Sequence, residues 1–238
     1  EPFLEIDLID KICDYIKVEQ FQRDHHWFGA YRFSFSTNGI NYHEEKVQQF
    51  ILKNKEHLSI GITIDGTEMK HDLNRVYKAS GRGSYKDVVR NIPLWLSQFP
   101  DASAKVTISS ADIPYIKESV LHLYALGIHE VNINCVFEDV WKAGDDRLFE
   151  EQLLMLADAI IDNGYYRDYS CSFFGEYLGK PLDCKLQNQN WCGAGMMLAV
   201  DAIFIHVLVL HNTPSVIRKL GSLAIFMMAL TRTSCGLS

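Results

Sequence analysis

Alternating strand-like and helix-like segments constrain the fold of this chain more than any other feature of its sequence. Short apolar runs of strand character alternate four times with segments of helical periodicity. This alternation is typical of parallel βαβ units, arranged in a barrel or in an open wound sheet. The expected strands are residues 30–37, 58–64, 105–109 and 130–137. The expected helices are residues 4–17, 43–56, 84–98 (opened by Ser84) and 145–163, together with one that Asp112 or Ser110 caps and Gly127 stops.

The composition agrees with a folded domain of this class. The 238 residues are 47% hydrophobic and 12% aromatic, which is ample for a buried core. A net charge of −7, without any run of Lys and Arg, argues against a nucleic-acid-binding surface. We expect no signal peptide, and the longest apolar stretches, residues 203–210 and 223–230, are too short to span a bilayer. The sequence therefore indicates a cytoplasmic protein that binds neither nucleic acid nor membrane.

The six cysteines include no Cys-x-x-Cys pair, and a chain of this length needs no disulfide framework. We expect reduced thiols. Cys13 and Cys135 lie in apolar periodic segments and are expected in the core, where free cysteine commonly lies. His25, His26 and Trp27 are adjacent and would point in different directions on a regular element. We therefore interpret them as a loop and not as a metal site.

Polar residues follow each expected strand. In both α/β architectures, ligands bind at the carboxyl ends of the strands. Hydroxyl and amide groups there can hold a ribose or an amino-acid head group, although Asn-Gly and Asp-Gly are also ordinary turn residues. The polar strand ends are Ser36–Gly39, Thr63–Gly66, Ser109-Ser110, and Asn132 and Asn134 followed by Glu138-Asp139.

Asp65-Gly66 has an alternative interpretation as a two-residue hairpin turn. The following residues, 69–77, do not alternate as a second strand would, and they carry His71, Asp72 and Arg75. We therefore reject the hairpin. Arg75 is then a candidate for clamping a carboxylate, which suits its planar guanidinium. The alternative is a solvated arginine on a helix surface.

In this order and spacing, these segments resemble the radical S-adenosylmethionine (radical SAM) enzymes, specifically those with a SPASM-type auxiliary cluster domain. The resemblance covers residues 1–202. Four segments carry it: Glu1-Pro2, similar to the end of a Gly-Gly-Glu-Pro motif; Ser36–Gly39, similar to a strand-end Thr-Asn-Gly; Ile62–Gly66 with His71-Asp72, Arg75 and Gly83–Tyr85, similar to the stretch that follows in the family; and Cys192–Gly195 with Val200-Asp201, similar to the start of a SPASM domain.

The resemblance implies an α/β fold with a partial (β/α)6-type radical SAM barrel, followed by the start of a SPASM-like auxiliary cluster domain. We expect the partial barrel in residues 1–165, a linker and the start of the SPASM-like domain in residues 166–202, and an aberrant tail in residues 203–238. The implied cofactors are S-adenosylmethionine and [4Fe-4S] clusters. The resemblance assigns no catalytic residue within this chain. It implies that Glu1 holds the methionyl amine, that Ser36, Asn38, Thr63 and Arg75 contact the ribose and carboxylate, and that Cys192 ligates an auxiliary cluster.

Two departures from the family pattern concern the clusters. The cysteine triplet of the cluster that cleaves S-adenosylmethionine should precede Glu1, and only Cys235 follows Cys192 where several SPASM cysteines should stand. One thiolate cannot hold such a cluster. We therefore expect a fragment of a longer enzyme, inactive as written.

The last segment of the chain suggests a reading-frame error. From Ile203 the sequence changes character, and codons can be chosen so that a reading one nucleotide earlier yields Asn-Ile-Tyr-Pro-Cys-Thr-Arg-Phe and later Val-Gly-Asn-Ile-Tyr-Asp-Gly-Ile-Asp. Both phrases resemble the continuation of a SPASM domain. Our interpretation is a small insertion or deletion near Ala202. The alternative is a genuine apolar tail that packs as a strand and a helix.

The subfamily most resembled is the peptide maturases that act on ribosomally made, Cys-rich precursor peptides. The shared segments are residues 1–7, Phe137–Trp141 and Trp191–Gly195. The implied reaction is reductive cleavage of S-adenosylmethionine and hydrogen abstraction from a precursor peptide, with flavodoxin or ferredoxin as reductant. The alternatives are an anaerobic sulfatase-maturing type of radical SAM enzyme, a cluster-free α/β-barrel enzyme that uses Asp65, Glu138 or Asp139 as acid or base, and a non-catalytic binding protein.

Overall fold

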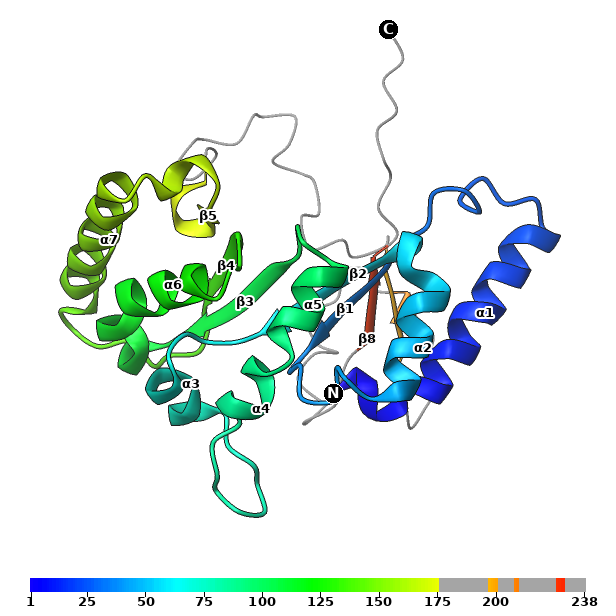
Figure 1. The fold of residues 1–238 in the computed structure, drawn as a ribbon, viewed down its shortest axis with the longest axis horizontal. Helices are drawn as coiled ribbons and strands as arrows, with labels where there is room; N and C mark the ends of the chain where they lie inside the picture. The colour runs from blue at the N-terminus through cyan, green and yellow to red at the C-terminus, as the bar shows by residue number, and fades with distance from the viewer. Residues whose placement is uncertain (176–196, 201–207, 210–225, 230–238) are drawn as a thin grey trace, which may run out of the picture. The chain divides into compact units, whose positions relative to one another are not determined.

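A parallel sheet with its strands in sequential order is the frame of this fold (Figure 1). The computed structural model describes residues 1–175, 197–200, 208–209 and 226–229. The five-stranded sheet has the order β1-β2-β3-β4-β5, and β2 to β5 pair in parallel. An open wound sheet reverses its strand order at a switch point, whereas a barrel wall does not. The predicted α/β fold is confirmed, and the order is that of a barrel wall.

The elements of the described residues follow the predicted alternation. The strands of the sheet are β1 (Phe33–Thr37), β2 (Leu58–Thr63), β3 (Ser103–Ile108), β4 (Glu130–Cys135) and β5 (Ser170–Cys171). The α-helices are α1 (Ile6–Gln22), α2 (Glu45–Asn54), α3 (Glu68–Asn74), α4 (Tyr85–Val89), α5 (Ile92–Gln98), α6 (Ile116–Ala125) and α7 (Asp145–Asp162). Short 3-10 helices are η1 (Pro2–Glu5), η2 (Lys55–His57), η3 (Ser110–Tyr115), η4 (Tyr165–Arg167) and η5 (Ser172–Phe174).

The described residues form two compact units. The first contains residues 1–37 and 41–60 with three short strands, and the second contains residues 38–40 and 61–175. The three strands make a separate antiparallel sheet in the order β7-β6-β8. They are β6 (Met197–Val200), β7 (Leu208–Val209) and β8 (Phe226–Ala229). The segment expected to begin the SPASM-like domain, with Cys192, and most of the tail lie outside the described residues.

Helices α1 and α2 pack together in the first unit. Ile6, Ile9 and Cys13 of α1 are buried, as helical spacing predicts. On the solvent side, Lys53 of α2 pairs with Asp10 at 2.9 Å and with Asp14 at 2.6 Å. These partly exposed pairs add little to stability, so the apolar contacts hold the two helices together.

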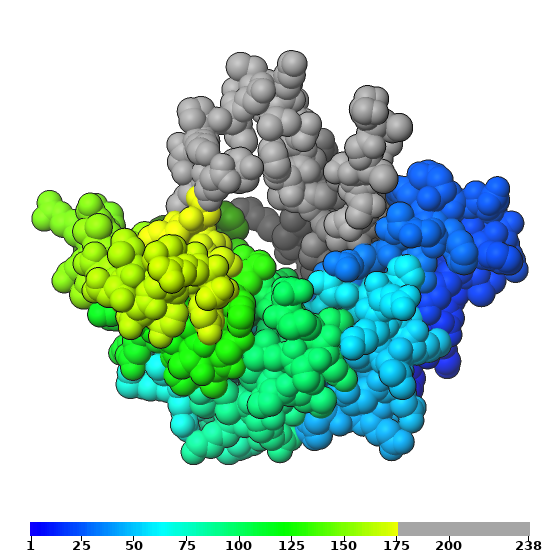
Figure 2. All heavy atoms as spheres, turned by 45° about the horizontal axis from the view of Figure 1, so that its top comes forward, coloured from blue at the N-terminus to red at the C-terminus, as the bar shows by residue number. Residues whose placement is uncertain are grey.

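The second unit has one apolar and one polar sheet face. In β3, Ala104, Val106 and Ile108 are at most 1% exposed and face the helices. Val131 and Ile133 of β4 are also buried on this face. The side chains between them are polar and partly or fully exposed. Parallel strands are commonly apolar on both faces, so a polar face is a departure that needs a reason. On the side shown in Figure 2, the green to yellow atoms of α4 through η5 form a continuous surface.

The expected helix at residues 84–98 is two helices. α4 ends at Val89 and α5 begins at Ile92, because Pro93 lacks the amide that a continuous helix requires. Asn91 fills the break. Its side-chain amide donates to the carbonyl oxygens of Gly39 at 2.8 Å and Ile40 at 3.0 Å.

Two of the expected helix caps are wrong in detail. Ser84 precedes α4, but its hydroxyl does not cap the helix; the Tyr85 amide donates to Asp72 Oδ1 at 2.9 Å instead. Before α6, Ser109 is the capping residue, and Asp112 is the acid of its capping box. At α4 the Asp72 carboxylate thus accepts the amide hydrogen bond expected of Ser84. Before α6 the expected Asp112 takes part in the cap, but the capping residue is Ser109 and not Ser110.

The cysteine expectations are partly confirmed. Cys13 is fully buried, whereas Cys135 is half-buried because it is the last residue of β4. Residues 25–27 lie in turns, as predicted, and their rings contact one another. Among the described helices, none combines the length and apolar character needed to cross a membrane.

Candidate functional site

The open face of the second unit's sheet is lined by hydroxyls, amides and one ammonium group. The pairing register places Thr63 opposite Lys105 and Lys105 opposite Asn132, and it places Thr107 opposite Asn134. All of these side chains are partly or fully exposed. Such a face offers hydrogen-bond donors and acceptors over three adjacent strands. It is therefore suited to a polar ligand rather than to an apolar layer.

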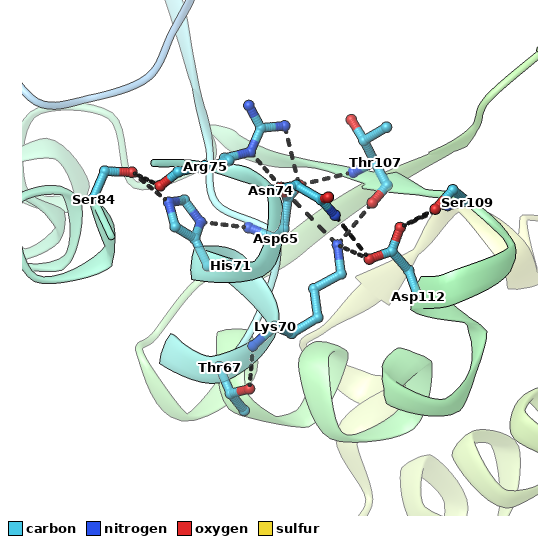
Figure 3. A network of polar contacts seen from close by, with 10 residues as sticks. All are labelled: Asp65, Thr67, Lys70, His71, Asn74, Arg75, Ser84, Thr107, Ser109 and Asp112. Atoms are coloured by element: carbon cyan, nitrogen blue, oxygen red, sulfur yellow. Dashed lines mark hydrogen bonds and ion pairs between the residues drawn. The ribbon is translucent and has the colours of Figure 1, made fainter. Parts of the chain in front are cut away.

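Asp65 fixes the carboxyl end of β2 (Figure 3). The chain leaves the sheet at Gly66, so the Thr107 amide of β3 no longer meets a backbone carbonyl of β2. Asp65 Oδ1 accepts this hydrogen bond at 2.9 Å. The side chain is 3% exposed and is bonded to Arg75, so it extends the strand ladder and anchors a cation at the same time.

Gly66 is required at this exit for two reasons. Its φ of +126° is a conformation that L side chains rarely adopt. A Cβ at this position would also lie 2.8 Å from Ser119 Cα, because α6 packs directly against it. The chain then enters α3, whose first turn is capped by Thr67. Asp65-Gly66 is thus a strand-to-helix exit, and rejection of the hairpin is confirmed.

Lys70 is the buried cation behind this exit. Its ammonium donates to the Thr107 carbonyl oxygen at 2.8 Å and lies 3.6 Å from Asp112 and 4.0 Å from Asp65. Burial lowers the pKa of Lys70, and the two carboxylates oppose that shift without cancelling it. Both aspartates and Lys70 are 2–3% exposed, so this group joins β2, α3 and η3 and is closed to a ligand.

Arg75, by contrast, has one edge of its guanidinium bonded to Asp65 and another edge exposed. Its Nε and Nη2 donate to the two carboxylate oxygens of Asp65, the latter bond at 3.3 Å. Arginine has five N–H donors, so this pairing leaves three for other acceptors. The side chain keeps 31% of its surface exposed. The guanidinium is therefore fixed in orientation, and its outer donors can receive a carboxylate.

His71 has a structural role. Its Nδ1 accepts the Asp65 amide at 3.1 Å, and its Nε2 lies 3.1 Å from the Ser84 hydroxyl. That hydroxyl donates to the Arg75 carbonyl oxygen at 2.9 Å, so Nε2 carries the proton and donates to it. Burial lowers the pKa of His71 to about 4. A neutral imidazole therefore ties both ends of α3 to the start of α4.

Glu1 lies beside the end of β1 in the first unit. Its Oε1 accepts the Thr37 hydroxyl at 2.6 Å and the Phe3 amide at 3.3 Å, so Glu1 also caps η1. Thr37 is 2% exposed. The side chain that the sequence assigned to the methionyl amine is thus positioned by a buried hydroxyl two residues from Phe35, in the apolar core.

The other expected contacts have varied surroundings. Ser36 is exposed on β1, and Thr63 is the last residue of β2. Asn38 Oδ1 accepts the Ile40 amide at 3.0 Å, so this side chain stabilises the turn at Gly39. Thr63 and Arg75 belong to one unit, whereas Glu1 and Ser36 belong to the other.

The described residues do not offer an iron–sulfur site. Burial raises the pKa of the Cys13 thiol to about 12 and of the Cys171 thiol to about 11, and it also raises that of Cys135. Metal ligation requires thiolates, which these environments disfavour. No group of three metal-ligating side chains occurs among the residues the structure describes. Cys192, the expected ligand, lies outside them.

Comparisons with known proteins find a similar fold among solved structures. No protein-family profile and no curated protein matches the chain. Among solved structures, the chain is similar to the sulfatase-maturating radical SAM enzyme anSMEcpe with bound AdoMet, at 19% identity and a TM-score of 0.52, over 67% of this chain and 43% of that one. The fold is radical SAM-like.

Two further anSMEcpe structures agree. The form with AdoMet and the Kp18Cys peptide matches at 18% identity and a TM-score of 0.53, covering 68% of this chain and 46% of that one. The form with AdoMet and the Cp18Cys peptide matches at 19% and 0.54, covering 78% and 52%. This chain therefore spans about half the length of these structures.

Sequence reasoning found Arg75 but missed the residues that hold it. In the sequence, Asp65 is a candidate acid or base and Asp112 a candidate helix cap. Nothing in the sequence marks Lys70, because a lysine on a short helix carries no sign of burial. The one available signal is the spacing of Lys70 and Asp65, which a helix capped by Thr67 brings to the same strand end.

Proposed function

We propose that this chain is part of a radical SAM enzyme that binds S-adenosylmethionine on the polar face of its parallel sheet. The observation that carries this proposal is Arg75, which Asp65 orients just after β2 while three of its N–H donors are not used by that pairing; Thr63, the last residue of β2, is two residues before Asp65. The fold supports it, since the structural neighbours bind AdoMet. In this proposal, Arg75 and Thr63 contact the methionyl carboxylate and the ribose hydroxyls.

Glu1, Ser36 and Asn38 complete this proposal. A carboxylate held by the Thr37 hydroxyl is a suitable partner for an ammonium group, which is the role proposed for Glu1. Ser36 and Asn38 contribute a hydroxyl and an amide for the ribose. S-adenosylmethionine, when bound and reduced by one electron, would supply the radical chemistry that removes a hydrogen atom from the substrate. Cys192 would be one ligand of an auxiliary [4Fe-4S] cluster; the cysteine triplet of the cluster that would reduce S-adenosylmethionine is not in this sequence, and flavodoxin or ferredoxin would be the electron donor.

The substrate we propose is a ribosomally made, Cys-rich precursor peptide, modified in the cytoplasm. The neighbours with bound Kp18Cys and Cp18Cys peptides support a peptide substrate. Residues 1–165 would form the partial barrel, residues 166–202 the entry to a SPASM-like domain, and residues 203–238 a tail produced by a frame error. A sulfatase-maturing activity is the second candidate, because the similar structures are of that type.

The cluster-free enzyme is disfavoured by the surroundings of its acids. Asp65 is hydrogen-bonded to the Thr107 amide and to Arg75 and is 3% exposed, so a ligand cannot reach it. Glu138 and Asp139 lie on an exposed loop after β4. General acid–base catalysis needs a group within hydrogen-bond reach of a bound substrate.

Calorimetric titration of S-adenosylmethionine into the chain tests the proposed site. Arg75→Met should weaken binding about tenfold, which corresponds to about 1.4 kcal/mol for a charged hydrogen-bonded pair. Arg82→Met, which removes an exposed arginine that pairs with Asp87, is the matched control and should leave affinity unchanged. Equal affinities in all three proteins, or no binding, would contradict the assignment of Arg75.

A further inference from the structure

The loop that follows β4 exposes apolar side chains at the carboxyl edge of the second unit's sheet. β4 ends at Cys135, and α7 begins at Asp145. Between them, Phe137 is fully exposed, and Val140 and Trp141 keep 41% and 37% of their surface exposed. A single exposed apolar side chain is ordinary on a protein surface, whereas a group of them with a polar rim is typical of an interaction site.

Hydrogen bonds at both ends order this loop. The Val136 amide donates to the Ile108 carbonyl oxygen of β3 at 3.0 Å, which continues the pairing of β4 by one residue. The Trp141 indole donates back to the Val136 carbonyl oxygen at 3.2 Å. Before α7, Asp145 Oδ2 accepts the Lys142 amide at 2.7 Å. The Trp141 ring is therefore held beside the end of β4, and a ligand would meet it with little further ordering of the loop.

The loop is also strongly acidic. Residues 137–146 contain four carboxylates and one ammonium group. Glu138 and Asp139 lie between the exposed apolar side chains, and within the described residues neither side chain forms a hydrogen bond or an ion pair. Two such carboxylates next to aromatic rings attract a cation, both by their charge and by the ring quadrupole. The charge of the loop therefore fits a cationic partner and disfavours an anionic one.

We propose that residues 137–146, the acidic loop, are a docking surface for the precursor peptide and select a segment with Lys or Arg next to an apolar residue. The identity of the partner as that peptide rests on the proposed function, whereas the preference for a cation rests on the loop alone. Glu138 and Asp139 receive the cationic group, and Phe137 and Trp141 contact its stem and the apolar neighbour. Because β2, β3 and β4 are parallel, docking here brings the peptide to the carboxyl edge that holds the proposed S-adenosylmethionine site.

Fluorescence anisotropy with labelled synthetic peptides tests the docking surface without any turnover. The three probes share one Cys-containing sequence and differ at a single position beside a Leu, which is Lys, Gln or Glu. The Lys peptide should bind about tenfold more tightly than the Gln peptide, and the Glu peptide should bind most weakly. The differences should shrink as salt screens the charges. Equal affinities for the three peptides would overturn the proposal.

A matched pair of double variants assigns the preference to the acidic loop. Glu138→Gln with Asp139→Asn should abolish the difference between the Lys and Gln peptides. Asp101→Asn with Asp158→Asn removes the same charge from exposed positions in the turn before β3 and in α7, and it should keep the difference. All four side chains are exposed, so both variants should fold as the parent does. A preference for Lys that survives in the loop variant would overturn the proposal.

A second matched pair tests the aromatic contact. Phe137→Ala should weaken binding of the Lys peptide at least threefold. Phe21→Ala, which truncates a phenylalanine of α1 that is 68% exposed, should leave this affinity unchanged. Self-association of the parent that Phe137→Ala abolishes, without peptide binding, would overturn the proposal in favour of a second copy of the chain as the occupant.

Calorimetric titration with S-adenosylmethionine separates this inference from the proposed function. The loop variants should bind S-adenosylmethionine as the parent does, because the acidic loop does not include Arg75 or Asp65. If the parent does not bind S-adenosylmethionine but prefers the Lys peptide through the loop, the proposed function fails and the docking surface stands. If it binds S-adenosylmethionine and does not discriminate among the peptides, the docking surface fails and the proposed function stands.

Discussion

At the scale of single residues, Asp65 decides the local structure. It replaces the missing backbone acceptor at the end of β2, bonds Arg75, and lies beside Lys70. The sequence singled out Asp65 and Arg75 separately, but it could not show that they pair. Thr107 and Asp112 lie more than forty residues further along the chain, so only the folded sheet brings them to Asp65. The local sequence pattern therefore identifies Arg75 as a candidate but does not show that Asp65 pairs with it.

Replacement of Asp65 by Asn should destabilise the protein strongly. The amide oxygen keeps the Thr107 hydrogen bond, but Arg75 and buried Lys70 lose a counter-charge. We expect a loss of about 3 kcal/mol in the free energy of unfolding, measured by urea denaturation. Glu68→Gln, at the first residue of α3, breaks the exposed pair with Lys86 and should change little. A similarly small effect of Asp65→Asn would show that the buried network contributes little to the free energy of unfolding.

The pH dependence of stability should report His71. Its pKa is about 4 when folded and 6.5 in the reference state, so the unfolded chain binds a proton that the folded chain refuses. Stability should therefore fall as pH drops from 6.5 toward 4, by about 2 kcal/mol between pH 7 and pH 5. Urea unfolding of His71→Gln should lack this contribution. An identical pH slope in the variant and the parent would refute the role of His71.

At the scale of elements, the alternation of strands and helices was predictable because hydrophobic periodicity is local. The expected strands at 58–64 and 130–137 correspond to β2 and β4 within two residues. The break between α4 and α5 was missed although Pro93 signals it, because periodicity continues across the proline. β5 was missed because two residues are too few for a pattern. The sequence shows the polar sheet face only as polar residues at the strand ends. Which side chains share that face depends on the pairing register, which only the folded sheet shows.

The exit from β2 gives a prediction for an element boundary. Gly66→Ala combines an unfavourable φ with a collision against the α6 backbone, and we expect a loss of more than about 2 kcal/mol in unfolding free energy. Gly81 has a positive φ of +67°, in the left-handed helical region, and lies in open space, so Gly81→Ala should lose only about 1 kcal/mol. Thermal and urea unfolding compare the two. Equal losses would mean that α6 moves aside and that its packing on Gly66 is not specific.

At the scale of the whole molecule, a sequential parallel sheet with one polar face accounts for the likeness to radical SAM structures. In our proposal the described residues contribute a place for S-adenosylmethionine. No group of three metal-ligating side chains occurs among them. The chemistry that the resemblance implies therefore depends on residues outside them. The sequence does not predict the strand order, so it allows both a barrel and an open wound sheet. The observed order β1-β2-β3-β4-β5 distinguishes them.

The most direct test of this account is formation of 5′-deoxyadenosine by the anaerobically reconstituted protein, expressed from the full open reading frame that its genomic locus encodes. We expect iron–sulfur absorbance, reductive cleavage of S-adenosylmethionine under a strong reductant, and a large loss of cleavage in Arg75→Met. A protein that carries its clusters but releases no 5′-deoxyadenosine would contradict the assignment of this fold to radical SAM chemistry.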